Sequence, residues 1–242
     1  MVMTKKKICI LLTSCINPNG MSFTKLQDPE LRCQQYLEAV EFYLRSTDIP
    51  VVFIDNSGVD ISGHFPEFIE SKRLEVLAFN GNDYDKSLGK GYGEALILEY
   101  AIAYSNIIYS SDLIVKITGR LKVANLMSLV NQAYHIDSLD ILADLRTMMS
   151  YADSRCFIGS IAFFQEFISH KGDINDTANV NFEQVFLKTI HIRMGAGHRF
   201  DLTRYFIRYL GMSGTSGLPI NVGWFYWFLK NLKYMLRYRL NK

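Results

Sequence analysis

The segment "SDLIVKITGRLKVAN", residues 111–125, pairs a buried-looking strand with a polar and cationic end. A continuous apolar run of this length is typical of a central strand in a parallel sheet. The residues at and after the end of the run are Lys116, Thr118, Gly119, Arg120 and Lys122. Positive charge is unusual at the end of a buried strand, and the sequence on both sides of this segment explains why it is there.

Strand and helix patterns alternate on both sides of this segment. The patterns predict strands at 8–12, 49–55, 74–79, 112–118 and 139–145, helices at 28–46, 90–105, 125–134 and 181–193, and a strand that passes into a helix at 155–169. Asp28 is the predicted N-cap of the first helix, and Pro29 its first residue. This order predicts an α/β fold with a mostly parallel sheet flanked by helices.

The composition excludes several classes of protein. The chain has 242 residues, 49% of them apolar, and a net charge of +2, which favours a globular domain and gives no reason to expect nucleic acid as a partner. No stretch reaches the roughly 20 apolar residues that a spanning helix needs. The four cysteines show no metal-binding spacing, so we expect reduced thiols.

Polar clusters follow three of the predicted strands. Ligands of parallel sheets bind at the carboxyl ends of the strands, where these clusters should meet. The clusters contain Thr13, Ser14 and Asn17, then Asp55 and Asn56, then Thr118, Gly119 and Arg120.

Residues 7–125 resemble the nucleotide-binding half of GT-A type glycosyltransferases. The resemblance rests on "LLTSCINPN", "VVFIDNSG", "SLGKGYGEALILEYAIAYS" and "DLIVKITGR" in that order. More narrowly, "KGYGE", "KITGR" and "SGTSG" look like bacterial surface-polysaccharide glycosyltransferases. The resemblance implies a GT-A-like fold, a nucleotide-diphosphate sugar as donor and a glycan acceptor, commonly lipid-linked.

The chain departs from that family at its metal motif. Where the family usually has Asp-x-Asp, this chain has Ile117-Thr118-Gly119-Arg120. Cationic side chains can neutralise a diphosphate as a metal ion does. We therefore expect no metal and no other cofactor, with the donor diphosphate near Lys116 and Arg120 and with Gly119 allowing close approach. The alternative is that the strand-end arginine pairs with a surface carboxylate.

Two further segments are candidates for donor binding. Asp55 and Asn56 suit the base and ribose of a nucleotide, although an ordinary Asx turn explains them equally well. Lys90 and Gly91 open a predicted helix whose N–H groups could face an anion; a plain helix entry is the alternative.

An inverting transferase needs a carboxylate to deprotonate the acceptor hydroxyl. Glu183 lies beside the apolar face of its predicted helix and is our first candidate, with Asp153 as the second. A helix-surface position is the alternative for Glu183, and a retaining enzyme requires no such base.

The last 21 residues contain five basic residues and no acidic one. Trp224–Phe228 form an aromatic run, and leucines and basic residues then fall on different faces of a helix. This pattern is typical of an interfacial helix on anionic lipid. A C-terminal helix that docks its aromatics on the core is the alternative.

The sequence thus predicts a GT-A-like catalytic domain at 1–218, with a donor half at 7–125 and an acceptor half at 126–218, and a membrane-associating helix at 219–242. The expected protein is a glycosyltransferase of surface polysaccharide synthesis, peripheral on the inner face of a bacterial cell membrane. A sugar-nucleotide nucleotidyltransferase and a non-catalytic scaffold of a membrane assembly remain the rival functions.

Overall fold

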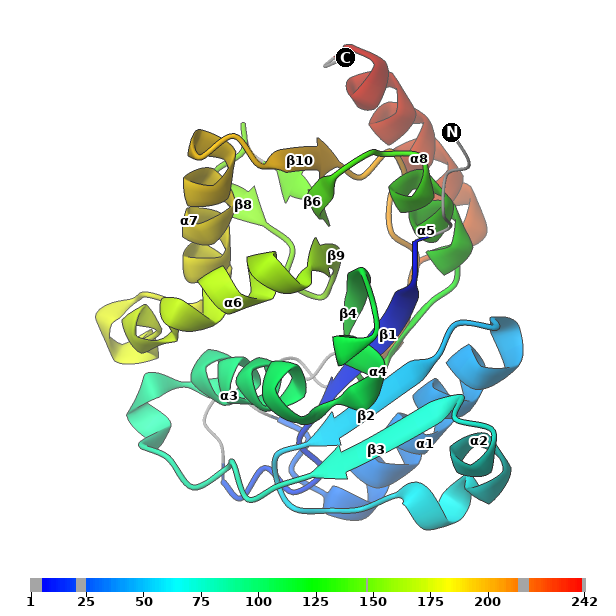
Figure 1. Ribbon diagram of the computed structural model, residues 1–242, viewed down its shortest axis with the longest axis vertical. Coiled ribbons are helices and arrows are strands. Elements are labelled where there is room, and N and C mark those ends of the chain that lie inside the picture. The colour runs from blue at the N-terminus through cyan, green and yellow to red at the C-terminus, as the bar shows by residue number, and fades with distance from the viewer. Residues whose placement is uncertain (1–5, 21–24, 147, 213–217, 241–242) are drawn as a thin grey trace.

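The computed structural model describes residues 6–20, 25–146, 148–212 and 218–240. A seven-stranded sheet forms its centre, in the order β10-β6-β9-β4-β1-β2-β3 (Figure 1). Its strands are β1 (Ile8–Ser14), β2 (Val51–Asp55), β3 (Leu74–Ala78), β4 (Leu113–Thr118), β6 (Leu139–Ala143), β9 (Cys156–Ser160) and β10 (Arg199–Leu202). All neighbours pair in parallel except β9, which is antiparallel to both β4 and β6. The predicted mostly parallel α/β fold is confirmed.

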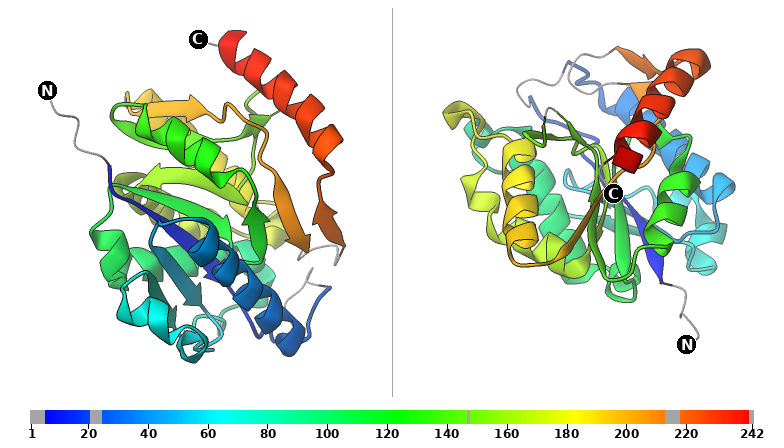
Figure 2. Two further views of the ribbon diagram at one scale, coloured as in Figure 1. Left: turned by 90° about the vertical axis from the view of Figure 1, so that its right-hand side faces the viewer. Right: turned by 90° about the horizontal axis from the view of Figure 1, so that it is seen from above.

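Helices cover both faces of the sheet (Figure 2). One face packs against α1 (Pro29–Ser46) and α5 (Leu126–Tyr134), and the other against α3 (Lys90–Tyr104), α6 (Ile161–Ser169) and α7 (Phe182–Gly195). The short helices α2 (Pro66–Glu70) and α4 (Asn106–Tyr109) lie in connections, and α8 (Trp224–Leu240) ends the described chain. Within the described residues, no helix combines the length and the apolar character needed to span a membrane.

Alternation along the central strand explains its continuous apolar run. Ile8, Ile10 and Leu12 of β1 belong to the core beneath α1 and α5, whereas Cys9 and Leu11 belong to the core beneath α3, α6 and α7. Successive side chains point to opposite faces, so a strand covered on both faces is apolar at every position.

The first helix begins where the sequence predicts. The Asp28 carboxylate accepts hydrogen bonds from the backbone N–H groups of Glu30 and Leu31, and Pro29 is the first helical residue. This cap directs α1 along the sheet with Arg32 and Tyr36 of its first turns at the carboxyl ends of the strands.

Two small sheets were not predicted. β5 (Leu121–Val123), β11 (Tyr209–Met212) and β12 (Pro219–Asn221) form one, and β7 (Leu145–Arg146) and β8 (Tyr151–Ala152) form the other. Because Pro219–Asn221 pair with β11, the C-terminal helix begins at Trp224 and not at residue 219. The "SGTSG" segment at 213–217 lies outside the described residues.

Candidate functional site

A cavity of about 500 Å³ opens at the carboxyl ends of β1 and β4 and the loop after β2. Its volume falls in the range of small-molecule sites. The predicted residues that line it are Thr13, Ser14, Asn56, Lys90, Thr118, Arg120 and Glu183. The fold therefore brings the ends of two strands, two loops and two helices, far apart in sequence, to one ligand-sized space.

Arg120 forms part of the cavity wall directly after β4. Its guanidinium donates to Gln35 Oε1 at 3.2 Å and lies 5.8 Å from the centre of the Tyr36 ring. Its buried Nε atom has no hydrogen-bond partner among the described residues. Burial lowers the pKa of Arg120, and the nearby charge of Arg32 acts in the same direction.

Arg32 of α1 is a second cation at this wall, which the sequence reasoning missed. Its guanidinium lies 5.9 Å from the same Tyr36 ring and donates from Nε to the Cys15 carbonyl at 2.9 Å. Both guanidinium groups thus lie within 5.9 Å of the centre of one aromatic ring. An anion in the cavity would offset their repulsion.

Asn56 adds an unpaired acceptor to the cavity lining. The side chain is 2% exposed, its Nδ2 donates weakly to the Gly93 carbonyl at 3.4 Å, and its Oδ1 has no partner among the described residues. Buried polar atoms are almost always paired in native proteins. An orphan acceptor on Asn56 and an orphan donor on Arg120 together indicate a polar ligand.

Lys116 lies beneath the cavity and does not line it. The side chain is fully buried, and its ammonium contacts Glu94 Oε1 at 2.5 Å and the Ser154 carbonyl at 2.8 Å. The ammonium also lies 3.4 Å from Thr118 Oγ1, which confirms that the two side chains share one face of β4. We expected the donor diphosphate to lie near Lys116. The structure places Lys116 outside the lining, and its partners Glu94, Ser154 and Thr118 line the cavity instead.

The two predicted glycines have structural reasons. A Cβ on Gly119 would lie 2.6 Å from the Thr13 carbonyl, to which the Gly119 N–H donates. A Cβ on Gly91 would lie 2.9 Å from the Cβ of Phe182. Gly119 is therefore needed for its backbone to approach β1, and Gly91 for its helix to approach α7. Neither glycine lines the cavity.

Asp55 organises the loops and does not face the cavity. It is fully buried, and its carboxylate accepts from the N–H groups of Ile16 and Ser57 and from the Ser14 hydroxyl. The Asx turn that we considered as the alternative is the observed arrangement. Asn17 is exposed and also lies outside the lining; its N–H donates to the Ser57 hydroxyl at 2.9 Å.

Two carboxylates line the cavity. Glu94 accepts from Lys116 and, at 3.0 Å, from the Thr13 hydroxyl. Among the described residues, Glu183 accepts from the Ser154 hydroxyl alone, at 2.8 Å. Glu94 was missed, although it ends the quoted "GKGYGE" segment and could have been identified as an acid on the sheet-facing side of α3. Glu183 keeps more of its carboxylate available for a substrate.

Asp153 lies buried behind the cavity wall. Its carboxylate pairs with Arg155 at 2.6 Å and with Arg146 at 2.9 Å. Burial acts to raise the pKa of Asp153, but the hydrogen bonds and charge of Arg155 outweigh it, so the pKa is lowered. A buried carboxylate held ionised by two arginines is poorly placed to take a proton from a substrate, and we do not carry Asp153 forward as a base.

Other lining residues could not be found from sequence patterns. They come from loops and from the short strand β8, and they include Asn82, Tyr84, Tyr151, Ser154 and Arg155. The Arg155 guanidinium lies 4.3 Å from the centre of the Tyr209 ring, so β11 helps to position it. Within the described residues, no three His, Cys, Asp or Glu side chains cluster in a way that could hold a metal ion.

Comparison with protein-family models and with curated proteins gives no match. Among solved structures, the chain is similar to the inositol-1-phosphate CTP transferase from T. maritima, with 10% identity, a TM-score of 0.48, and 89% of this chain and 92% of that chain covered. It is also similar to the mannosyltransferase Ktr4p from S. cerevisiae, with 8% identity, a TM-score of 0.44, and 85% of this chain and 70% of that chain covered. A third similar structure is the glycosyltransferase GlyE of Streptococcus pneumoniae TIGR4, with 7% identity, a TM-score of 0.48, and 83% of this chain and 45% of that chain covered. These similarities concern the backbone fold alone and assign no function to any residue of this chain.

Proposed function

We propose that the protein is a glycosyltransferase that moves a sugar from a nucleotide-diphosphate donor to a glycan hydroxyl. The observation that carries the proposal is the make-up of the cavity lining. It combines Arg120 with its unpaired Nε, a second guanidinium on Arg32 and the unpaired Oδ1 of Asn56. Two guanidinium groups match a diphosphate, and an amide matches the hydroxyl or imide groups of a nucleoside.

Glu183 is the proposed base on the opposite side of the cavity. Its carboxylate would take the proton of the acceptor hydroxyl while the hydroxyl oxygen attacks the anomeric carbon. The bond from that carbon to the diphosphate breaks, and the leaving group gains negative charge beside Arg120. Ser154, which donates to Glu183, positions the carboxylate.

Charged side chains take the role that a divalent cation has in the family that the sequence resembles. Arg32, Lys90, Arg120 and Arg155 all line the cavity, against two carboxylates. Arg155 also pairs with Asp153, and Arg32 donates to backbone carbonyls, whereas the Nε of Arg120 has no partner among the described residues. We propose that a diphosphate is held at Arg120 and that turnover needs no metal. We further propose that the acceptor is a growing surface glycan, on the ground of the sequence resemblance.

A thermal-shift screen against UDP-, GDP-, dTDP- and CMP-sugars, each with EDTA and with Mn²⁺, tests the proposal. A ligand that binds only the folded state raises the unfolding midpoint. A shift with one base that EDTA does not change supports the proposal. A shift that requires Mn²⁺ removes the charge-replacement part, and the absence of any shift contradicts the donor site.

A second assay separates the rival functions. A nucleotidyltransferase would release pyrophosphate from a nucleoside triphosphate and a sugar phosphate, whereas a glycosyltransferase would release a nucleoside diphosphate from the donor. A scaffold would release neither.

A further inference from the structure

Helix α8 exposes an apolar stripe along its outer face. Phe225, Leu229, Leu232, Leu236 and Leu240 follow one another at three- or four-residue intervals, which places them on one side of the helix. Leu232, the least exposed of the five, still has 44% of its surface accessible, and Leu240 has 86%. Exposed apolar patches of this kind usually mark an interaction surface.

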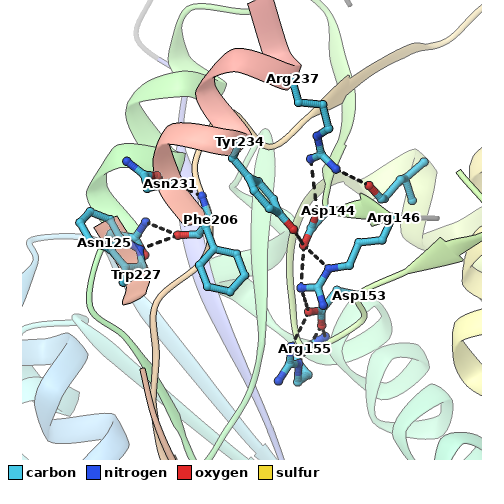
Figure 3. A network of polar contacts seen from close by, with 11 residues as sticks. Asn125, Asp144, Arg146, Asp153, Arg155, Phe206, Trp227, Asn231, Tyr234 and Arg237 are labelled. Atoms are coloured by element: carbon cyan, nitrogen blue, oxygen red, sulfur yellow. Dashed lines mark hydrogen bonds and ion pairs between the residues drawn. The ribbon is translucent and has the colours of Figure 1, made fainter. Parts of the chain in front are cut away.

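The opposite face of α8 is held by hydrogen bonds, so the orientation of the stripe is fixed. The Trp227 indole donates to the Phe206 carbonyl at 2.8 Å, and Asn231 Oδ1 accepts from the Phe206 N–H at 3.1 Å (Figure 3). Further along, Tyr234 donates to Asp144 at 2.9 Å and Tyr238 to Asp201 at 2.8 Å. The helix therefore cannot turn its leucines inward without losing these contacts.

The charge beside the stripe has one sign. Helix α8 contains no acidic residue, and Lys233 and Arg239 are exposed on positions that flank the leucines. Arg237 belongs to the inner side, where it donates to the Leu145 carbonyl at 2.8 Å and lies 3.4 Å from Asp144. Apolar side chains flanked by cations complement an anionic lipid surface.

The aromatic residues gather at one end of the same surface. Trp224, Phe225, Tyr226 and Phe228 are all exposed in the first turns of α8. Aromatic side chains favour the boundary between lipid headgroups and acyl chains. Docking on the core, the alternative considered from the sequence, accounts for Trp227, Tyr234 and Tyr238. The contacts of the other aromatics lie within α8 itself: Trp224 stacks on Phe228 with 5.5 Å between the ring centres, and Lys230 lies over the Tyr226 ring, yet all four remain exposed.

We propose that α8 binds an anionic membrane surface, lying in its plane with the stripe in the lipid. The proposal does not rest on the proposed chemistry, but it has a consequence for it. Arg155, which lines the cavity, is joined to α8 through Asp153, Arg146, Asp144 and Tyr234 (Figure 3). A bound α8 would hold the cavity at a fixed place relative to the lipid.

The test uses the whole chain with vesicles of phosphatidylcholine alone and vesicles with an equal share of phosphatidylglycerol. Leu232→Glu should lower sedimentation with the anionic vesicles by about tenfold or more, because it removes apolar burial and adds repulsion. Leu31→Glu on α1 is the matched control, since Leu31 is 43% exposed and Leu232 44%. The wild-type protein should bind the neutral vesicles less, and salt should weaken binding to the anionic ones.

Three outcomes would overturn the proposal. They are no binding of wild type to anionic vesicles, equal losses in the two variants, and unchanged binding of Leu232→Glu. A wild-type dimer that Leu232→Glu converts to a monomer, without vesicle binding, would show that a second copy covers the stripe. Circular dichroism of each variant checks the fold, and donor-induced thermal shifts are read separately, so failure of this proposal does not affect the donor site.

Discussion

The ammonium of Lys116 lies 2.5 Å from the Glu94 carboxylate, directly beneath the cavity. Lys116 comes from β4 and Glu94 from α3, and the same ammonium donates to the carbonyl of Ser154, whose hydroxyl reaches Glu183. One buried cation thus connects both cavity carboxylates.

Lys116→Met should lower the free energy of unfolding by about 2–3 kcal/mol. The change leaves Glu94 without its cation, and removal of one partner of a buried pair is costly, although Glu94 is 24% exposed and keeps some water. Urea unfolding measures the effect. Addition of Glu94→Gln should recover part of the loss; if it adds a second, independent loss, the pair is not coupled.

Arg120→Gln should weaken binding of the donor that gives the largest thermal shift by tenfold or more. Hydrogen bonds between charged groups contribute about 1.5–3 kcal/mol. Isothermal titration calorimetry measures the affinity. Arg193→Gln is the control, because Arg193 pairs with Asp140 at 2.8 Å and does not line the cavity. Equal losses in both variants would point to a general effect on folding.

Glu183→Gln should lower kcat by about 10²–10⁴-fold with little change in the donor KM, as expected for loss of a general base. Initial rates of nucleoside diphosphate release give both constants. Glu166→Gln provides the comparison, since Glu166 pairs with His170 at 3.1 Å away from the lining. Full activity of Glu183→Gln would instead favour a retaining mechanism.

Tyr234→Phe should cost about 1.5 kcal/mol at neutral pH, because Asp144 loses a hydrogen bond but keeps Arg146. Burial, assisted by the charge of Asp144, raises the pKa of Tyr234 to about 12. Because the pKa of Tyr234 is higher in the folded protein than the value of 10.0 in the unfolded chain, the protonated hydroxyl stabilises the folded protein fully below pH 10. This contribution to the free energy of unfolding is lost as the pH rises toward 12.

Urea unfolding between neutral and strongly alkaline pH checks this second effect. The wild-type protein should lose more stability over that range than Tyr234→Phe. Tyr226→Phe, at an exposed position on the same helix, should behave as the wild type. Parallel pH profiles for wild type and Tyr234→Phe would contradict the assignment.

Much of the fold could be predicted because it depends on local patterns. The apolar runs of β1, β2 and β4 are long enough to identify strands covered on both faces, and Asp28 with Pro29 marks the start of α1. The short strands β5, β7, β8, β11 and β12 have two to four residues each and form only where distant segments meet. No local signal identifies them.

The candidate site could be predicted only in outline. The rule for parallel sheets placed Thr13, Asn56 and Thr118 at one edge, and all three line the cavity. Arg32 and Arg155 were missed, since a single polar residue in a helix or before a strand carries no sign of the direction in which it points. Glu94 was missed although its place on the sheet-facing side of α3 could have identified it.

The sequence by itself determined the order of the longer strands and the helices, the two-sided core and the positive end of β4. Only the tertiary structure decided which cation lines the cavity, because Lys116 is paired with Glu94 of α3, whereas Arg120 forms part of the lining and keeps an unpaired Nε. It likewise decided which side of α8 is exposed. Propensity and alternation act over a few residues, but the partners of a buried charge come from anywhere in the chain, and the fold alone brings them within reach.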